Sequence, residues 1–263
     1  MRRTMAPVKP FLSAAAATDR VQEARISVVI PAFNEAAYLG PTIDAVRRSF
    51  ETLPAECHVR PEIIVVDNAS TDGTADVARA LGTQVVTEPL RGVARARNAG
   101  ARAASGEILV FLDADTLVPL DFAPRLTEAA CDPGCLGGAF DTDHRPARAS
   151  LRVYLAFWRV VGLCLRVGQG AAQFCRRSAF DALGGYDERL HMGEDVRFYQ
   201  RLKRLARQRG ARVRYIWVAV VPSPRRWDRW PLWKTLVWTN PVAAGLLGRW
   251  QGLWRGWHET PPR

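Results

Sequence analysis

The chain has 263 residues, 48% of them hydrophobic, and is therefore long enough to bury the core of one α/β domain. Lysines and arginines number 37 against 26 aspartates and glutamates, which gives a formal net charge of +11. This excess favours an anionic partner, a class that includes nucleotide phosphates, an acidic membrane face and nucleic acid. No uncharged apolar run reaches the ~18 residues of a spanning helix, so the sequence predicts no membrane-spanning helix.

The cysteines and the N-terminal segment predict a cytosolic setting. Five cysteines are scattered, and no second close pair or nearby histidine joins Cys131 and Cys135 to complete a zinc site. We therefore expect reduced thiols. Residues 1–24 read as a disordered tail, because prolines and Lys9 interrupt the apolar stretch that a signal peptide needs.

Residues 26–115 alternate short β-branched runs with helical patterns, which predicts a Rossmann-like, mostly parallel sheet flanked by helices. In open sheets of this type, ligands bind beyond the carboxyl ends of the strands. Polar segments that begin at Pro31, Asp67 and Asp113 all follow expected strands. The strands are expected at 26–31, 62–66, 83–87 and 107–112, and the helices at 38–50, 74–81 and 93–104.

The second half of the chain has a less regular pattern. We expect strands or extended segments at 136–141, 169–175 and 212–221, and helices at 149–167, 178–183 and 194–208. Beyond Pro222 the composition changes, with seven of the nine tryptophans between Trp227 and Trp257. The predicted organisation is a tail at 1–24, one domain at 25–225, and a Trp/Arg-rich extension at 226–263.

Two acidic residues, Asp113 and Asp115, follow the apolar run 107–112. Residues i and i+2 of a strand point the same way, so both carboxylates can reach one site. Such hard oxygen ligands suit Mg²⁺ or Mn²⁺ held between carboxylates and substrate phosphates. The same pattern recurs at Asp141 and Asp143, where we favour a purely structural role.

Two further segments carry candidate binding groups. Asp67 follows an expected strand, and its carboxylate can accept hydrogen bonds from a base or ribose. Asp72 and Thr74, by contrast, are assigned to the turn and helix cap. Arg91, Arg95 and Arg97 stand at the front of a helix, where cations are locally unfavourable unless an anion binds there.

Glu194 and Asp195 open a long basic helix. Either acid can cap this helix, or one can remove a proton from an attacking hydroxyl. The local sequence leaves these two interpretations open.

The order of the motifs is more specific than any one of them. It closely resembles that of the family 2 glycosyltransferases of GT-A fold, over about residues 26–205. The motifs are VVIPAFNE (28–35), VVDNASTDGT (65–74), ARNAG (96–100), FLDAD (111–115), GGYDE (184–188) and GED (193–195).

The resemblance implies an enzyme that transfers a sugar from a nucleotide diphosphate sugar to an acceptor hydroxyl with inversion, and a UDP-sugar is favoured. It implies that Asp115 ligates Mg²⁺ or Mn²⁺, that Asp113 contacts ribose or the metal shell, and that Asp195 is the base, with Glu194 positioning the acceptor. The remaining nucleotide-sugar-binding residues that it implies are Pro31, Ala32, Phe33, Glu35, Asp67, Arg91, Arg97 and Asn98.

Departures from the family narrow the expected activity. Processive synthases of this family carry a Gln-x-x-Arg-Trp segment and spanning helices, whereas only Arg226 and Trp227 match here. We therefore expect a single-addition enzyme whose acceptor is a lipid carrier, a small metabolite or a glycan. His191, three residues before Glu194, can touch the diphosphate, but we favour a surface-loop position for it.

The C-terminal region mixes tryptophan with arginine, and Arg152, Arg159 and Arg166 recur every seven residues in an apolar run. This combination suits an amphipathic helical region that either closes the domain or lies on an anionic membrane. The predicted location is cytoplasmic, with peripheral attachment to the inner membrane face as the alternative.

One functional alternative is a basic Arg/Trp-rich module that binds nucleotide, nucleic acid or lipid without catalysis. It leaves the six ordered motifs unexplained, so we expect no nucleic-acid partner.

Overall fold

The structure is a computed structural model that describes residues 25–54, 59–165 and 170–229. The predicted tail at 1–24 and most of the C-terminal extension lie outside these ranges. The short helix α9 (Arg225–Arg229) spans the predicted boundary after residue 225, and the division into domains stays a prediction.

Eight strands form one sheet, in the order β3-β2-β1-β4-β7-β6-β8-β5. The first four run parallel to one another, β7 is antiparallel to both of its neighbours, and β6 and β8 are parallel. The mostly parallel α/β fold is thus confirmed. The strands are β1 (Ile26–Ala32), β2 (Glu62–Asp67), β3 (Gln84–Thr87), β4 (Ile108–Leu112), β5 (Thr116–Leu117), β6 (Cys135–Thr142), β7 (Ala172–Arg176) and β8 (Arg212–Pro222).

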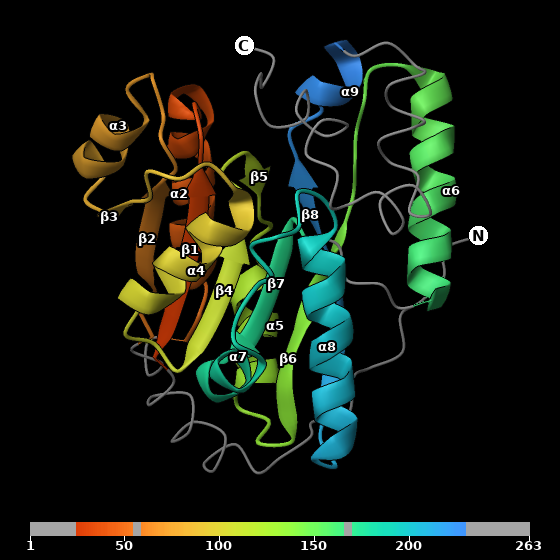
Figure 1. Ribbon diagram of the computed structural model, residues 1–263. Helices are drawn as coiled ribbons and strands as arrows, with labels where there is room; N and C mark the ends of the chain where they lie inside the picture. Colours follow the sequence, from red (N-terminus) through yellow and green to blue (C-terminus); the bar gives the residue numbers. More distant parts are fainter. Residues whose placement is uncertain (1–24, 55–58, 166–169, 230–263) are drawn as a thin grey trace.

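Helices cover both faces of the sheet, which explains why the central strands are apolar almost without interruption. Val28 and Ile30 of β1 belong to one buried cluster, while Val29 between them belongs to the other. The first cluster lies under α2 (Ala36–Glu51), α3 (Thr74–Ala80) and α5 (Phe122–Ala130). The second lies under α4 (Val93–Ala103), α7 (Arg177–Leu183) and α8 (Glu194–Gln208), as Figure 1 shows.

Most expected elements are present within a few residues, and α8 has the predicted bounds. The sequence analysis missed β5, α5 and α9. Strand β5 has only two residues and gives no periodic signal. Helix α5 does carry one, since Phe122, Leu126 and Ala130 recur at helical spacing, and Pro124 lies in the first turn, where proline is tolerated. Helix α9 is only five residues long, which is too short to give a helical pattern in the sequence.

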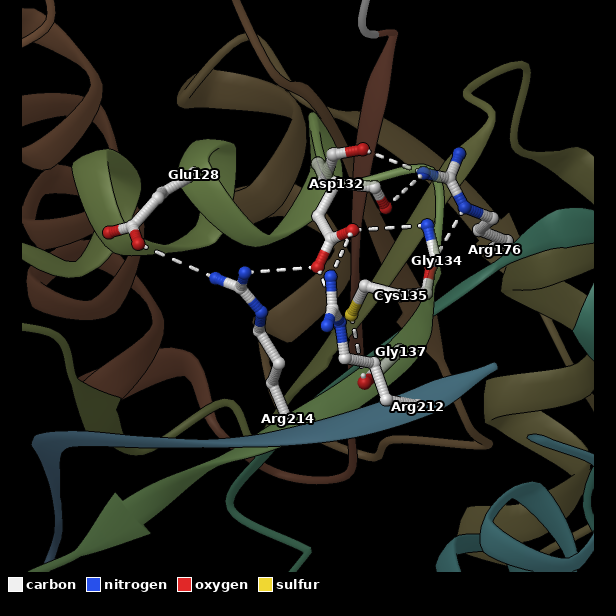
Figure 2. Close-up of polar contacts among 9 residues, drawn as sticks. Glu128, Asp132, Gly134, Cys135, Gly137, Arg176, Arg212 and Arg214 are labelled. Carbon is white, nitrogen blue, oxygen red and sulfur yellow. Dashed lines mark hydrogen bonds and ion pairs between the residues drawn. The ribbon is translucent and has the colours of Figure 1, made fainter. Parts of the chain in front are cut away.

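The amino ends of β6 and β8 are fastened by a charged cluster around Asp132 (Figure 2). Arg212 and Arg214 each donate to its carboxylate at 2.9 Å, and Arg176 donates to its backbone carbonyl at 3.0 Å. Strands β6 and β8 are parallel, and their pairing continues to Thr142 and Val220 with irregularities after Cys135 and Phe140. The carboxyl ends of the two strands, at Thr142 and Pro222, border the site.

Helix α6 (Ala149–Leu165) stands at the edge of the molecule (Figure 1). Leu151 and Leu155 pack with Trp227, whereas Val153 and Phe157 on the other side are exposed by 73% and 58%. Within the described residues no helix is both long and apolar enough to cross a membrane.

Phe111 lies at the centre of an aromatic cluster and is fully buried. We expect Phe111→Ala to lower the free energy of unfolding by about 3–5 kcal/mol, through lost apolar burial and a residual cavity. Urea denaturation measures this change. Trp217→Ala is the matched control, because this side chain is 70% exposed, and it should change stability by about 0.5 kcal/mol or less. Equal losses in the two variants would contradict the placement of Phe111.

Candidate active site

A cavity of about 370 Å³, called the main cavity below, opens at the carboxyl ends of β1, β4 and β8. The starts of α4 and α8 and the short helix α9 complete its wall. This is the position at which open α/β sheets bind ligands. The site is therefore assembled from both halves of the chain.

The structure brings together ten of the twelve predicted site residues. Pro31, Ala32, Phe33, Glu35, Arg91, Arg97, Asp113, Asp115, Glu194 and Asp195 line the main cavity, whereas Asp67 and Asn98 are not in its lining.

Asp67 and Asn98 have local structural contacts instead. The carboxylate of Asp67 accepts a hydrogen bond from the backbone N–H of Ser70 at 3.1 Å. The amide of Asn98 donates to the carbonyl of Tyr186 and accepts from its N–H, at 3.0 and 2.9 Å, which fixes the GGYDE loop on α4. Asn68, next to Asp67, lines the main cavity, and its side-chain amide donates to the carbonyls of Glu88 and Leu90.

Arg97 connects the two halves of the site. Its side chain is only 3% exposed, and its two terminal nitrogens bind Asp113 at 2.9 Å and Glu194 at 2.8 Å. Burial by itself would lower the pKa of Arg97, but the charges of Asp113, Tyr186 and Glu194 outweigh it and hold the pKa above its ordinary value. The guanidinium is therefore a permanent cation that fixes the end of β4 against the start of α8.

The arginines at the front of α4 consequently differ from the sequence-based interpretation. We treated them as cations that require a bound anion, yet Arg95 is paired with Glu188 at 2.9 Å and Arg97 with two carboxylates. Arg91 places its guanidinium 3.0 Å from the centre of the Phe33 ring. Cation–π stacking of this kind positions Arg91 at the cavity mouth.

A second buried arginine, Arg225, likewise joins two carboxylates of the main cavity. It is 5% exposed and binds both Glu35 and Asp115, the latter at 3.0 Å. The sequence analysis missed its role, although two arginines directly after a strand at the carboxyl edge were a usable signal. Burial raises the pKa of Glu35 to about 7, partly offset by Arg225, and burial likewise raises the pKa of Asp115.

Asp195 differs from the other acids of the main cavity. Glu35, Asp113, Asp115 and Glu194 are all paired with Arg97 or Arg225, whereas Asp195 has no ion pair within the described residues. Burial, followed by the charge of Glu194, raises the pKa of Asp195 to about 7. A carboxylate with such a pKa is suited to accept a proton at neutral pH.

Local backbone features direct Asp195 into the cavity. Gly193 has φ of +73° at the start of α8, a left-handed conformation that favours glycine. Gly170 lies so close that a side-chain methyl group there would overlap the Asp195 carboxylate. The N-cap position is Gly193, which offers no side chain to the helix.

The structure also shows the contacts of several other polar residues whose roles were predicted from the sequence. Asp141 and Asp143 bind Arg159 of α6, which confirms their structural role, and Asp72 accepts from the N–H of Thr74 at 2.9 Å as expected. His191, for which we favoured a surface-loop position, lies in the segment before α8 and lines the main cavity.

Residues 27–160, about half of the chain, match the family described as Glycosyl transferase family 2. The chain belongs to this family. The expected enzyme class and GT-A fold are thereby confirmed at the level of the family.

Named relatives and solved structures agree with the assignment. The glycosyltransferase AglE of Haloferax volcanii is 28% identical over 67% of this family 2 chain, and the match covers 60% of AglE. The chain thus spans less than two thirds of that relative's length.

Two solved structures resemble the fold. Mannosyltransferase PcManGT of Pyrobaculum calidifontis, in complex with GDP-Man and Mn²⁺, has a TM-score of 0.65 and 22% identity, covering 92% of this chain and 72% of its own. Glucosyl-3-phosphoglycerate synthase of Mycobacterium tuberculosis, in complex with Mn²⁺ and UDP-glucose, has a TM-score of 0.58 and 25% identity, covering 92% and 84%.

Arg97→Met should lower the free energy of unfolding by about 3–5 kcal/mol, because it leaves Asp113 and Glu194 as uncompensated, partly buried charges. Denaturant unfolding at neutral pH measures the loss. Arg102→Met, on the exposed surface of the same helix, is the matched control and should change stability by about 0.5 kcal/mol or less. Similar stabilities of the two variants would show that the bridge is not essential to the fold.

Proposed function

We propose that this chain transfers a sugar from a nucleoside diphosphate sugar, a UDP-sugar by preference, to an acceptor hydroxyl with inversion at the anomeric carbon. One observation carries the proposal. Asp195, the cavity acid without an ion pair in the described part of the chain, faces the same space as Asp113 and Asp115. A proton acceptor and a cation-binding pair thus share one cavity, as a direct displacement requires.

The residues of the main cavity fit a divalent cation of the Mg²⁺ or Mn²⁺ type. Asp113, Asp115 and Glu35 supply hard oxygen donors, and Glu35 Oε2 is buried without a hydrogen-bond partner among the described residues. No cluster of three potential ligands occurs in the described ranges. Mg²⁺ does not need one, since it is commonly held by one or two carboxylates together with substrate phosphates.

In the proposed reaction, a cation bound by Asp115 and Asp113 would neutralise charge on the departing diphosphate. Asp195 removes the proton of the acceptor hydroxyl, and the oxygen attacks the anomeric carbon from the face opposite the diphosphate. The bond from that carbon to the diphosphate oxygen breaks as the new glycosidic bond forms. Because the attacking oxygen comes from the acceptor, no covalent enzyme intermediate is required.

Several contacts keep Asp195 in place for this step. Gln173 donates to the backbone carbonyl of Asp195 at 3.2 Å and accepts from the hydroxyl of Tyr186 at 3.1 Å. Glu194 is held by Arg97, so it is available to position the acceptor rather than to accept the proton. These contacts fix the start of α8 against β7.

Cytoplasmic location with peripheral attachment to a membrane stays part of the proposal. The exposed apolar side chains of α6 support such contact, since Val153, Phe157 and Val160 lie on one side of the helix. The Trp/Arg-rich residues 230–263, which first suggested this attachment, lie outside the described ranges.

Donor binding tests the proposal directly. Thermal unfolding is measured with UDP-, GDP-, dTDP- and CDP-sugars, each with Mn²⁺ and with EDTA. A ligand at ~100 times its dissociation constant stabilises a protein by ~2.7 kcal/mol, so one nucleotide class should raise the melting temperature in Mn²⁺ only. Asp115→Asn should abolish this shift, because it removes a charged metal ligand. An unchanged shift in Asp115→Asn would contradict the metal assignment.

Turnover should depend on the protonation of Asp195. Its pKa is raised to about 7, so the basic form predominates above that pH and is lost as the pH falls through it. We expect kcat to decrease about tenfold for each unit below pH 6, measured with saturating donor. Asp195→Asn should bind donor as tightly as the unmodified chain but lose at least about 10³-fold in kcat, in the range of combined base and positioning effects. Retained turnover would transfer the role to another group.

A further inference from the structure

A second cavity of about 390 Å³, called the side cavity, lies between the segment after β6 and helix α6. It shares two lining residues with the main cavity, Thr142 and His144. The two cavities therefore adjoin each other where β6 ends. A molecule seated in the side cavity would extend toward Asp195 past this junction.

The lining of the side cavity has an excess of positive charge. Arg145, Arg152 and Arg159 line it, against one acid, Asp143. Arg145 and Arg159 both bind Asp143, at 2.8 and 2.9 Å, and Arg159 also binds Asp141 behind the cavity. Arg152 has no ion pair with any described residue. One guanidinium at this cavity thus lacks an anionic partner within the described structure.

Thr142 supplies a second, independent indication of a ligand. Its side chain is 3% exposed, and its hydroxyl has no hydrogen-bond partner among the described residues. A buried hydroxyl without a partner is unfavourable, and native structures rarely keep one without a reason. Thr142 lines both cavities, so a rotation of its side chain would present this buried hydroxyl to a group that crosses the junction.

We propose that the side cavity is the acceptor subsite and that it takes an acceptor bearing a phosphate group, which Arg152 binds. This inference rests on the proposed transferase function. A guanidinium presents two parallel N–H donors that match phosphate oxygens, and Arg145 and Arg159 add positive charge nearby. The acceptor hydroxyl then passes Thr142 and reaches Asp195 in the main cavity. Arg152 is exposed and hydrated when the side cavity is empty, so a neutral acceptor would gain nothing from its charge.

The test uses the full chain saturated with UDP and Mg²⁺, so that the diphosphate-binding groups of the main cavity are already occupied. Inorganic phosphate and glycerol 3-phosphate are then titrated by calorimetry. We expect both to bind the unmodified chain and to bind Arg152→Gln at least tenfold more weakly, with Arg152→Lys intermediate. Arg102→Gln removes the same charge from an exposed site outside both cavities and should bind like the unmodified chain. Thr142→Val should weaken binding severalfold, with its melting temperature recorded as a folding control.

Vesicle sedimentation distinguishes a soluble acceptor from a lipid headgroup. Phosphatidic acid vesicles present a phosphomonoester, while phosphatidylserine vesicles are anionic without one. If glycerol 3-phosphate binds and the chain sediments equally with both kinds of vesicle, the acceptor is a soluble phosphorylated molecule. A preference for phosphatidic acid that Arg152→Gln abolishes indicates a phospholipid-like acceptor.

The proposal is overturned if phosphate and phosphatidic acid fail to bind the UDP-saturated chain, or if Arg152→Gln binds them as tightly as the unmodified chain. Failure of UDP, GDP, dTDP and CDP alike to bind would instead reject the proposed transferase function. The two failures are separated because nucleotide binding is measured first, on the same samples.

Discussion

The buried guanidinium of Arg97 is the interaction on which the rest of the site depends. It joins Asp113, at the end of a strand in the first half of the chain, to Glu194, at the start of a helix in the second half. A buried cation must be paired and hydrogen-bonded, so the two carboxylates cannot move apart without a large loss of stability. Arg225 imposes the same constraint on Glu35 and Asp115 across the cavity.

This pairing also determines which acid is chemically available. Four of the five cavity acids are bound to the two arginines, which stabilise their ionised forms. Asp195 lies beside Glu194 and receives no such direct pairing from the described residues, so burial and the neighbouring negative charge raise its pKa to about 7. Burial raises the pKa of Glu35 to about 7 as well, but that carboxylate is bound to Arg225, so Asp195 is the cavity acid that no arginine of the described residues pairs directly.

The two ends of β6 and β8 have different roles. At their amino ends, the Asp132 cluster joins the two strands (Figure 2). At their carboxyl ends, Thr142 lines both cavities and Pro222 lines the main cavity. The charged cluster that joins the strands thus lies at the opposite end of β6 and β8 from the site.

The sequence by itself determined the fold class and most of the site. Alternating apolar strands and helices predict a parallel sheet, and the carboxyl ends of such strands meet at one edge, so Pro31, Asp113 and their neighbours were expected to lie together. Only the tertiary structure decided how the charges are paired. Arg97 and Glu194 are 97 positions apart and Glu35 and Arg225 are 190 apart, and local patterns carry no information about which distant side chains meet. For the same reason, the sequence did not reveal that Asn98 lies outside the lining of the main cavity, or that Arg152 lines the side cavity.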